Sequence, residues 1–207
     1  MIVKVCGMND PENIHDVAAL GIDLIGYIFY TKSPRCFRPP AGEAFFSLTG
    51  GKMGTVCVSV NATEDEFSEM LRYRPTFLQL HGTELPDCCR RFRRQGVGVI
   101  KAIPVATAAD LNKAIPYEGT VDYFLFDTKC DTYGGSGRSF DWTVLDAYIG
   151  QTPFLLSGGL RPETAEVVTR FRHPRFAGID LNSGFETSPG LKDVAQLRTF
   201  LNSLLSA

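Results

Sequence analysis

The sequence predicts a single eight-stranded (β/α)8 TIM barrel over residues 1–207. Short β-branched or aromatic runs alternate with longer helix-like segments, which is typical of a parallel sheet covered by helices. Eight such units fit into 207 residues, near the lower size limit of a TIM barrel. An open sheet of about five or six strands would leave about two or three units without a place. No Pro/Gly/Ser-rich linker divides the chain, so one domain is expected.

The strands are predicted where apolar and β-branched residues run together. We expect them at residues 2–6, 23–29, 54–59, 77–81, 97–103, 121–127, 153–157 and 176–181. Helix starts between them carry a small polar cap or a first-turn proline, as at residues 9–12, 61–64 and 161–163. A further helix is expected around residues 39–49.

Composition and charge exclude several classes of function. With 21 basic and 23 acidic residues, a net charge of −2 and no long run of either sign, the chain is not expected to bind nucleic acid or a membrane surface. No secretory signal and no stretch of about 18 apolar residues is present, which favours a cytoplasmic location. The six cysteines are then expected to be reduced, and they lack a paired zinc-type spacing, so no metal is expected. A homo-oligomer is compatible with the sequence.

Polar and small residues follow most of the predicted strands at their C-terminal ends. In a TIM barrel the active site forms at that end, so these positions are where function should lie. They are Cys6, Lys32-Ser33-Pro34-Arg35, His81, Asp127, Ser157-Gly158-Gly159 and residues 180–184.

Glycine-containing clusters follow the sixth, seventh and eighth predicted strands. Glycine lets the backbone approach an anion closely, and the loops after strands seven and eight are the usual phosphate site of this fold. A tight turn explains any one cluster equally well, but clusters at both phosphate-site positions favour a ligand. We expect phosphate contacts from Gly135, Ser136, Gly137, Gly158, Gly159, Asn182, Ser183 and Gly184.

Two strand-end residues are suited to proton transfer. Cys6 is either a small buried hydrophobe or, with a lowered pKa, a thiolate facing a ligand. Asp127 follows four apolar residues, so it is either a solvated carboxylate or helix cap, or an acid in a partly dry pocket. Together they form a possible acid–base pair for moving a proton between adjacent carbons. Lys4 shares the face of Cys6 by the two-residue period of a strand.

Three further residues are predicted to bind the ligand. Arg35, in a Ser-Pro-Arg loop, is either solvated or a bidentate clamp on a carboxylate across the barrel mouth from the phosphate. Asp180 and His81 are suited to hydrogen-bond sugar hydroxyls, although a structural histidine is the alternative for His81.

Taken in order, these motifs resemble the phosphoribosylanthranilate isomerase family from the first strand to the last helix. They are Lys4-Val5-Cys6-Gly7-Met8, Lys32-Ser33-Pro34-Arg35, Leu78-Gln79-Leu80-His81-Gly82, Phe126-Asp127-Thr128, Gly134-Gly135-Ser136-Gly137 with Phe140-Asp141-Trp142, Leu156-Ser157-Gly158-Gly159-Leu160 with Pro162-Glu163, and residues 180–186 with 189–193.

The resemblance implies an isomerase of tryptophan biosynthesis that performs an Amadori rearrangement on a phosphosugar–anthranilate substrate without metal or cofactor. It implies Cys6 as general base, Asp127 as general acid, Arg35 on the anthranilate carboxylate and Asp180 on sugar hydroxyls. Ser157 stands where the family commonly has alanine, and Phe185 replaces a smaller aliphatic residue, which affects only the expected shape of the phosphate loop.

Two alternatives are also compatible with the sequence. The related isomerase of histidine biosynthesis shares the fold and rearrangement, but it resembles a doubled half-barrel with two phosphate sites and an aspartate base. Here Cys6 stands at the base position, and the first half shows no matching glycine cradle. The other alternative, a barrel that binds a sugar phosphate without catalysis, needs neither Cys6 nor Asp127.

Overall fold

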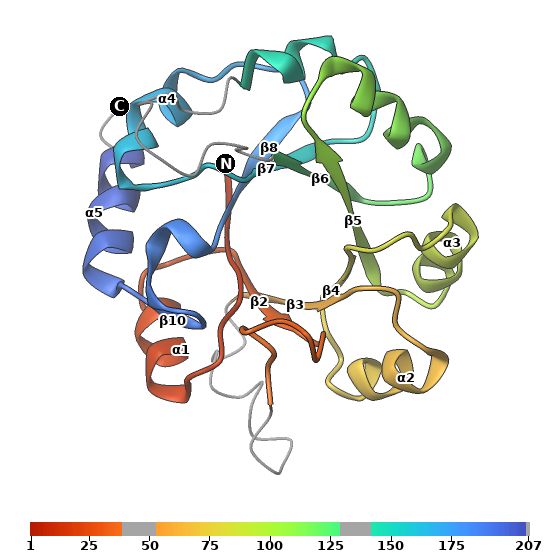
Figure 1. Ribbon diagram of the computed structural model, residues 1–207, viewed down its shortest axis with the longest axis horizontal. Helices are drawn as coiled ribbons and strands as arrows, with labels where there is room; N and C mark the ends of the chain where they lie inside the picture. The colour runs from red at the N-terminus through yellow and green to blue at the C-terminus, as the bar shows by residue number, and fades with distance from the viewer. Residues whose placement is uncertain (39–52, 129–141, 206–207) are drawn as a thin grey trace.

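Eight parallel strands close into a barrel in the order of the sequence, β1 to β8 (Figure 1). This computed structural model describes residues 1–38, 53–128 and 142–205. The barrel closes where β1 pairs with β8, from Ile2 opposite Gly178 to Val5 opposite Leu181. The strands are β1 (Ile2–Val5), β2 (Leu24–Ile28), β3 (Gly54–Ser59), β4 (Phe77–Leu80), β5 (Gly98–Val105), β6 (Tyr123–Thr128), β7 (Phe154–Ser157) and β8 (Phe176–Leu181).

Helices form a ring outside the barrel, as Figure 1 shows in the view down its shortest axis. The α-helices are α1 (Pro11–Ala18), α2 (Glu64–Arg72), α3 (Pro86–Arg94), α4 (Ala165–Arg170) and α5 (Val194–Leu205). Shorter 3-10 segments are η2 (Ala108–Tyr117), η3 (Trp142–Ala147), η4 (Pro162–Thr164) and η5 (Ser183–Phe185). A small antiparallel pair, β9 (Glu186–Ser188) and β10 (Leu191–Lys192), follows the last barrel strand. The predicted TIM barrel is therefore confirmed.

Two of the three predicted helix starts carry a side-chain cap, and the third has its first-turn proline, Pro162. The Asp10 side chain accepts a hydrogen bond of 2.8 Å from the backbone N–H of Asn13 at the start of α1. At α2, Thr63 and Glu66 form a reciprocal capping box. The start at residues 161–163 instead leads into the three-residue η4 before α4 begins. The helix expected around residues 39–49 lies outside the described residues.

Two apolar layers fill the fold, one inside the barrel and one between strands and helices. Alternate strand residues such as Leu24, Val56, Ile100 and Leu125 meet inside the barrel in one cluster that also includes Cys6. The residues between them, facing the helices, belong to the larger cluster. Because the side-chain period of a strand is two, this alternation decides which strand-end side chains point into the barrel mouth.

Strand bounds differ from the predicted ones by up to two residues, as at β6, which begins at Tyr123 rather than at residue 121. The Asp122 carboxylate accepts a hydrogen bond of 2.7 Å from the backbone N–H of Val99 instead of extending the strand. Among the described residues, no helix combines the length and the apolar character needed to cross a membrane.

Candidate active site

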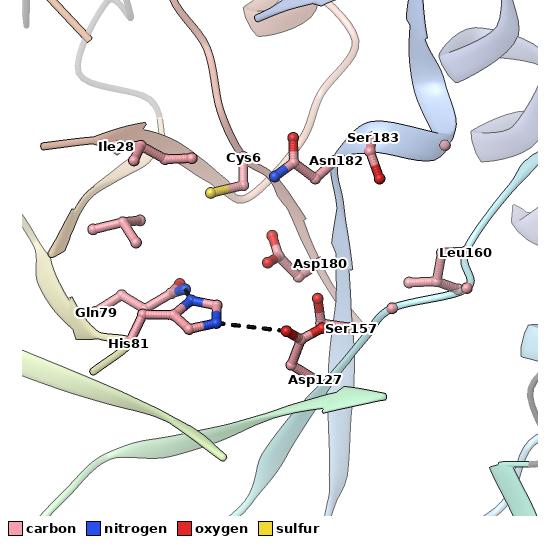
Figure 2. Close-up of a pocket in the computed structure, with 14 residues that line it drawn as sticks. Cys6, Ile28, Gln79, His81, Asp127, Ser157, Leu160, Asp180, Asn182 and Ser183 are labelled. Atoms are coloured by element: carbon pink, nitrogen blue, oxygen red, sulfur yellow. Dashed lines mark hydrogen bonds and ion pairs between the residues drawn. The ribbon is translucent and has the colours of Figure 1, made fainter. Parts of the chain in front are cut away.

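A pocket of about 240 Å³ lies at the C-terminal ends of the strands and is lined mainly by residues of the strand ends and the loops that follow them. The predicted acid–base pair and the two residues predicted to contact sugar hydroxyls all line it: Cys6, Asp127, His81 and Asp180. They come from β1, β4, β6 and β8 or directly follow these strands, so residues distant in sequence meet at one end of the barrel. In Figure 2, Cys6 and Asp127 lie on opposite sides of Asp180.

Two backbone loops form another wall of the same pocket. Gly158 and Gly159, after β7, have φ values of 82° and 68°, which glycine adopts without steric cost. Asn182, Ser183 and Gly184, after β8, also line the pocket. A side chain at Gly184 would collide with the carbonyl oxygen of Leu160, so glycine allows the two loops to lie against each other. This wall has the place and the composition that the fold uses for phosphate.

The predicted cluster of Gly135, Ser136 and Gly137 lies outside the described residues, as does Cys130.

The two departures from the family pattern have separate surroundings. Ser157 lines the pocket, whereas Phe185 is fully buried beside Phe200 of α5, with ring centroids 4.9 Å apart. Phe185 therefore anchors the loop after β8 to the helical layer and does not contact the pocket.

A histidine and a glutamine stand beside Asp127. The Nε2 atom of His81 lies 3.5 Å from Oδ2 of Asp127, the contact dashed in Figure 2. On the other side of the ring, Nε2 of Gln79 lies 3.2 Å from Nδ1 of His81. If that amide nitrogen donates, a neutral imidazole carries its proton on Nε2, directed at Asp127. Gln79 is not among the predicted site residues, although the two-residue period of a strand places it on the same face as His81.

The buried end of the pocket holds Lys4, which is fully buried and whose Nζ atom lies 2.8 Å from Oδ1 of Asp180. Burial raises the pKa of the Cys6 thiol, and the nearby Lys4 ammonium works against this rise. Burial also raises the pKa of Asp180, again against the effect of Lys4. Lys4 itself is held in its charged form, because Asp180 and Cys6 outweigh the effect of burial and raise its pKa.

Gly26 on β2 makes room for the Cys6 sulfur. A methyl group at Gly26 would lie 2.7 Å from Sγ of Cys6 and 3.2 Å from Nζ of Lys4. Glycine at this inward position therefore lets the thiol and the ammonium occupy the same small space. Gly26 is not among the predicted site residues, because its role depends on which side chains meet it inside the barrel.

We expect Gly26→Ala to lower the free energy of unfolding by about 1–3 kcal/mol, as other insertions into packed cores do. Urea unfolding measures this cost. In a Cys6→Ala background, where the sulfur is gone, the same substitution should cost less, which a double-mutant cycle detects. An equal cost in both backgrounds would show that the sulfur is not what limits the space.

Arg35 lies at the rim, outside the set of residues that line the pocket. Its Nε and Nη2 atoms donate to the Glu186 carboxylate at 2.6–2.9 Å. Lys192 also donates to Glu186, at 2.6 Å, and to Oδ1 of Asn182 at 3.0 Å. Burial alone raises the pKa of Glu186, but these cationic partners outweigh it and the pKa is lowered. A methyl group at Gly7 would touch both Arg35 and Asn182, so the arginine lies next to the phosphate-type wall.

Glu186 and Lys192 were not predicted as site residues. Both occur in the quoted motifs, but nothing in their spacing indicates that they meet Arg35, which is 151 residues from Glu186. Among the described residues, no group of three or more His, Cys, Asp or Glu side chains is arranged to hold a metal ion.

A closed parallel barrel with ionisable side chains gathered at the C-terminal ends of its strands defines the class of TIM-barrel enzymes. The family model described as N-(5'phosphoribosyl)anthranilate (PRA) isomerase matches residues 3–203 of this chain. The N-(5'-phosphoribosyl)anthranilate isomerase of Parabacteroides distasonis is 53% identical over 210 residues, which cover 99% of this chain and 94% of that protein. The chain therefore belongs to the N-(5'-phosphoribosyl)anthranilate isomerase family.

Solved structures agree with this assignment. The crystal structure of phosphoribosyl anthranilate isomerase from Thermotoga maritima is similar with a TM-score of 0.85 at 30% identity, over 100% of both chains. A structure of phosphoribosyl anthranilate isomerase in complex with reduced 1-(o-carboxyphenylamino)-1-deoxyribulose 5-phosphate has a TM-score of 0.83 at 28% identity, also over 100% of both chains.

Proposed function

We propose that this chain isomerises N-(5'-phosphoribosyl)anthranilate to 1-(2-carboxyphenylamino)-1-deoxyribulose 5-phosphate, an Amadori rearrangement in tryptophan biosynthesis. The observation that carries the proposal is the presence of Cys6 and Asp127 in one pocket beside two glycine-containing loops. The family assignment and the product-like ligand named for the related solved structure support the same reaction.

In the proposed reaction Asp127 is the general acid. Its proton passes to the ring oxygen of the ribose as the bond between that oxygen and C1 breaks, and the nitrogen lone pair forms a Schiff base with C1. His81, 3.5 Å from the Asp127 carboxylate, is placed to orient it. The half-exposed position of both side chains leaves the acid accessible to the substrate.

Cys6 is the general base in the second step. Its thiolate takes the proton from C2, the electrons of that C–H bond move into the C1–C2 bond, and the Schiff base becomes an enolamine. Tautomerisation then gives the ketone at C2. Only protons move between substrate and protein in these steps, so they need no redox or metal cofactor.

The remaining pocket residues are proposed to hold the substrate. Gly158 and Gly159 after β7, with residues 182–184 after β8, would bind the phosphate through backbone N–H groups. Asp180 lines the same pocket and lies between Cys6 and Asp127 in Figure 2, a position suited to a sugar hydroxyl. Arg35, at the rim, would bind the anthranilate carboxylate by sharing its donors with Glu186 or turning away from it.

The reaction is tested by fluorescence. Purified protein mixed with N-(5'-phosphoribosyl)anthranilate should remove the anthranilate-type fluorescence at a rate proportional to enzyme concentration. Binding without turnover would instead favour a barrel that holds a sugar phosphate without catalysis. Turnover of the corresponding histidine-pathway substrate at an equal rate would contradict the proposed specificity for anthranilate.

Arg35→Ala is expected chiefly to weaken binding. Loss of a charge-assisted hydrogen bond costs about 1.5–3 kcal/mol, which corresponds to an increase in KM of about 10- to 100-fold. Steady-state kinetics with fluorescence detection separates KM from kcat. Arg91→Ala is the control, because Arg91 pairs with Glu64 on the outer helices and should leave both constants unchanged. A loss confined to kcat would contradict the binding role of Arg35.

A further inference from the structure

Lys4 is a fully buried cation that the proposed chemistry does not use. It lies on β1 with its side chain inside the barrel, and its neighbours Val3 and Val5 face the helices. Its ammonium pairs with Asp180, which is directly opposite it in the register of β1 and β8. A buried charge is costly unless it is paired, so the position of Lys4 calls for a reason beyond packing.

The Lys4 ammonium and the Cys6 sulfur both border the small space beside Gly26. A methyl group built at Gly26 would lie 3.2 Å from Nζ of Lys4 and 2.7 Å from Sγ of Cys6, so both atoms border the space that this glycine leaves empty. Asp180 holds the ammonium from the other strand. One cation therefore stands between two groups that can each carry a negative charge.

The chemistry of Cys6 requires such a cation. A base must be a thiolate, yet the thiol is only 3% exposed and burial favours its neutral form. Lys4 and, from β10, Lys192 favour the thiolate, whereas Asp180 disfavours it. The other ionisable groups that line the pocket are His81 and Asp127; in Figure 2 Asp127 lies on the far side of Asp180 from Cys6, with His81 beside Asp127.

We propose that Lys4 is a positioning residue that favours the thiolate form of Cys6, and that Asp180 limits this effect by competing for the same ammonium. The inference rests on the proposed role of Cys6 as the base. It also gives Asp180 a second task, because a substrate hydroxyl that donates to Asp180 would weaken its hold on Lys4. Substrate binding would then strengthen the base at the moment when it is needed.

The test measures Cys6 without substrate. Iodoacetamide alkylates thiolates, and peptide mass spectrometry follows Cys6 separately from the other cysteines as a function of pH. In Lys4→Met we expect alkylation near neutral pH to fall by about tenfold, because the thiolate pKa rises by about one unit. Lys4→Arg keeps the charge and should retain most of the reactivity.

Asp180→Asn is the decisive second variant, because electrostatics predicts the opposite sign. Removing the competing carboxylate should increase Cys6 alkylation and move its midpoint to lower pH. General loosening of the fold would move both variants in the same direction. If circular dichroism shows that Lys4→Met does not fold, Asp180→Asn is compared with the alkylation of Cys57, which is fully buried. Loosening would raise the alkylation of both cysteines, whereas the proposed effect raises that of Cys6 alone.

Lys101→Met is a matched control. Lys101 is 2% exposed and pairs with Glu84 at 3.1 Å, but it lies on the outer face of β5, between the inward-facing Ile100 and Ala102. The Lys101→Met substitution should lower stability without changing the pH profile of Cys6 alkylation. The proposal is overturned if Lys4→Met leaves that profile unchanged, if Lys101→Met shifts it equally, or if Asp180→Asn slows alkylation. An inactive enzyme would still report on Lys4, since alkylation does not depend on isomerase activity.

Discussion

Cys6→Ser is expected to abolish most turnover, with kcat and kcat/KM both falling by about 10²- to 10⁴-fold, while substrate affinity stays nearly the same. Cys6 lines the pocket, and a serine side chain has nearly the shape and size of the cysteine side chain. A hydroxyl, however, is a far poorer base near neutral pH than a thiolate, and Lys4 does not close that gap. Fluorescence kinetics gives kcat and KM, and isothermal titration with a product analogue gives the affinity.

Cys57→Ser provides the matched control. Cys57, in β3, is buried as Cys6 is, but its side chain faces the helical layer and does not line the pocket. The control should lose stability, because it places a hydroxyl among apolar side chains, and should keep its turnover. Activity in Cys6→Ser equal to that of the unaltered enzyme would remove Cys6 from the mechanism.

The fold could be predicted from the sequence because the periods of strands and helices are local properties of the chain. Each predicted strand overlaps an observed one, and β3 and β8 match their predicted bounds at 54–59 and 176–181. The helical connections were harder to predict. η2 continues through Pro116 as a 3-10 segment, in which tertiary packing against β5 overrides weak local periodicity. The short η3 has the same character.

Site residues could be predicted from the sequence only where they lie at the ends of strands or in the loops that follow them. A strand-terminal side chain in a TIM barrel faces the mouth if its parity is right, which is why Cys6, His81 and Asp127 were found to line one pocket. The ion pairs of these site residues could not be predicted from the sequence. The pairs of Arg35 with Glu186 and of Lys4 with Asp180 join residues more than 150 positions apart, and only closure of the barrel brings them together.

Asp127→Asn is expected to lower kcat by about 10²- to 10⁴-fold with little change in binding. The amide has nearly the shape of the carboxyl group and can still contact His81, but it has no acidic proton to give to the ring oxygen. Loss of an interaction made only in the transition state lowers kcat and kcat/KM together. Single-turnover fluorescence measurements follow the chemical step directly.

Asp122→Asn is the control on the same chain segment. Asp122 immediately precedes β6 at the opposite end of the barrel, where its carboxylate accepts the Val99 N–H and pairs with Arg93 at 3.0 Å. In TIM barrels the N-terminal ends of the strands contribute to stability, and the C-terminal ends carry the chemistry. Asp122→Asn should therefore lower the unfolding free energy and leave kcat unchanged. If Asp127→Asn behaved in the same way, ring opening would not depend on an acid from β6, and Asp127 would serve only to hold His81.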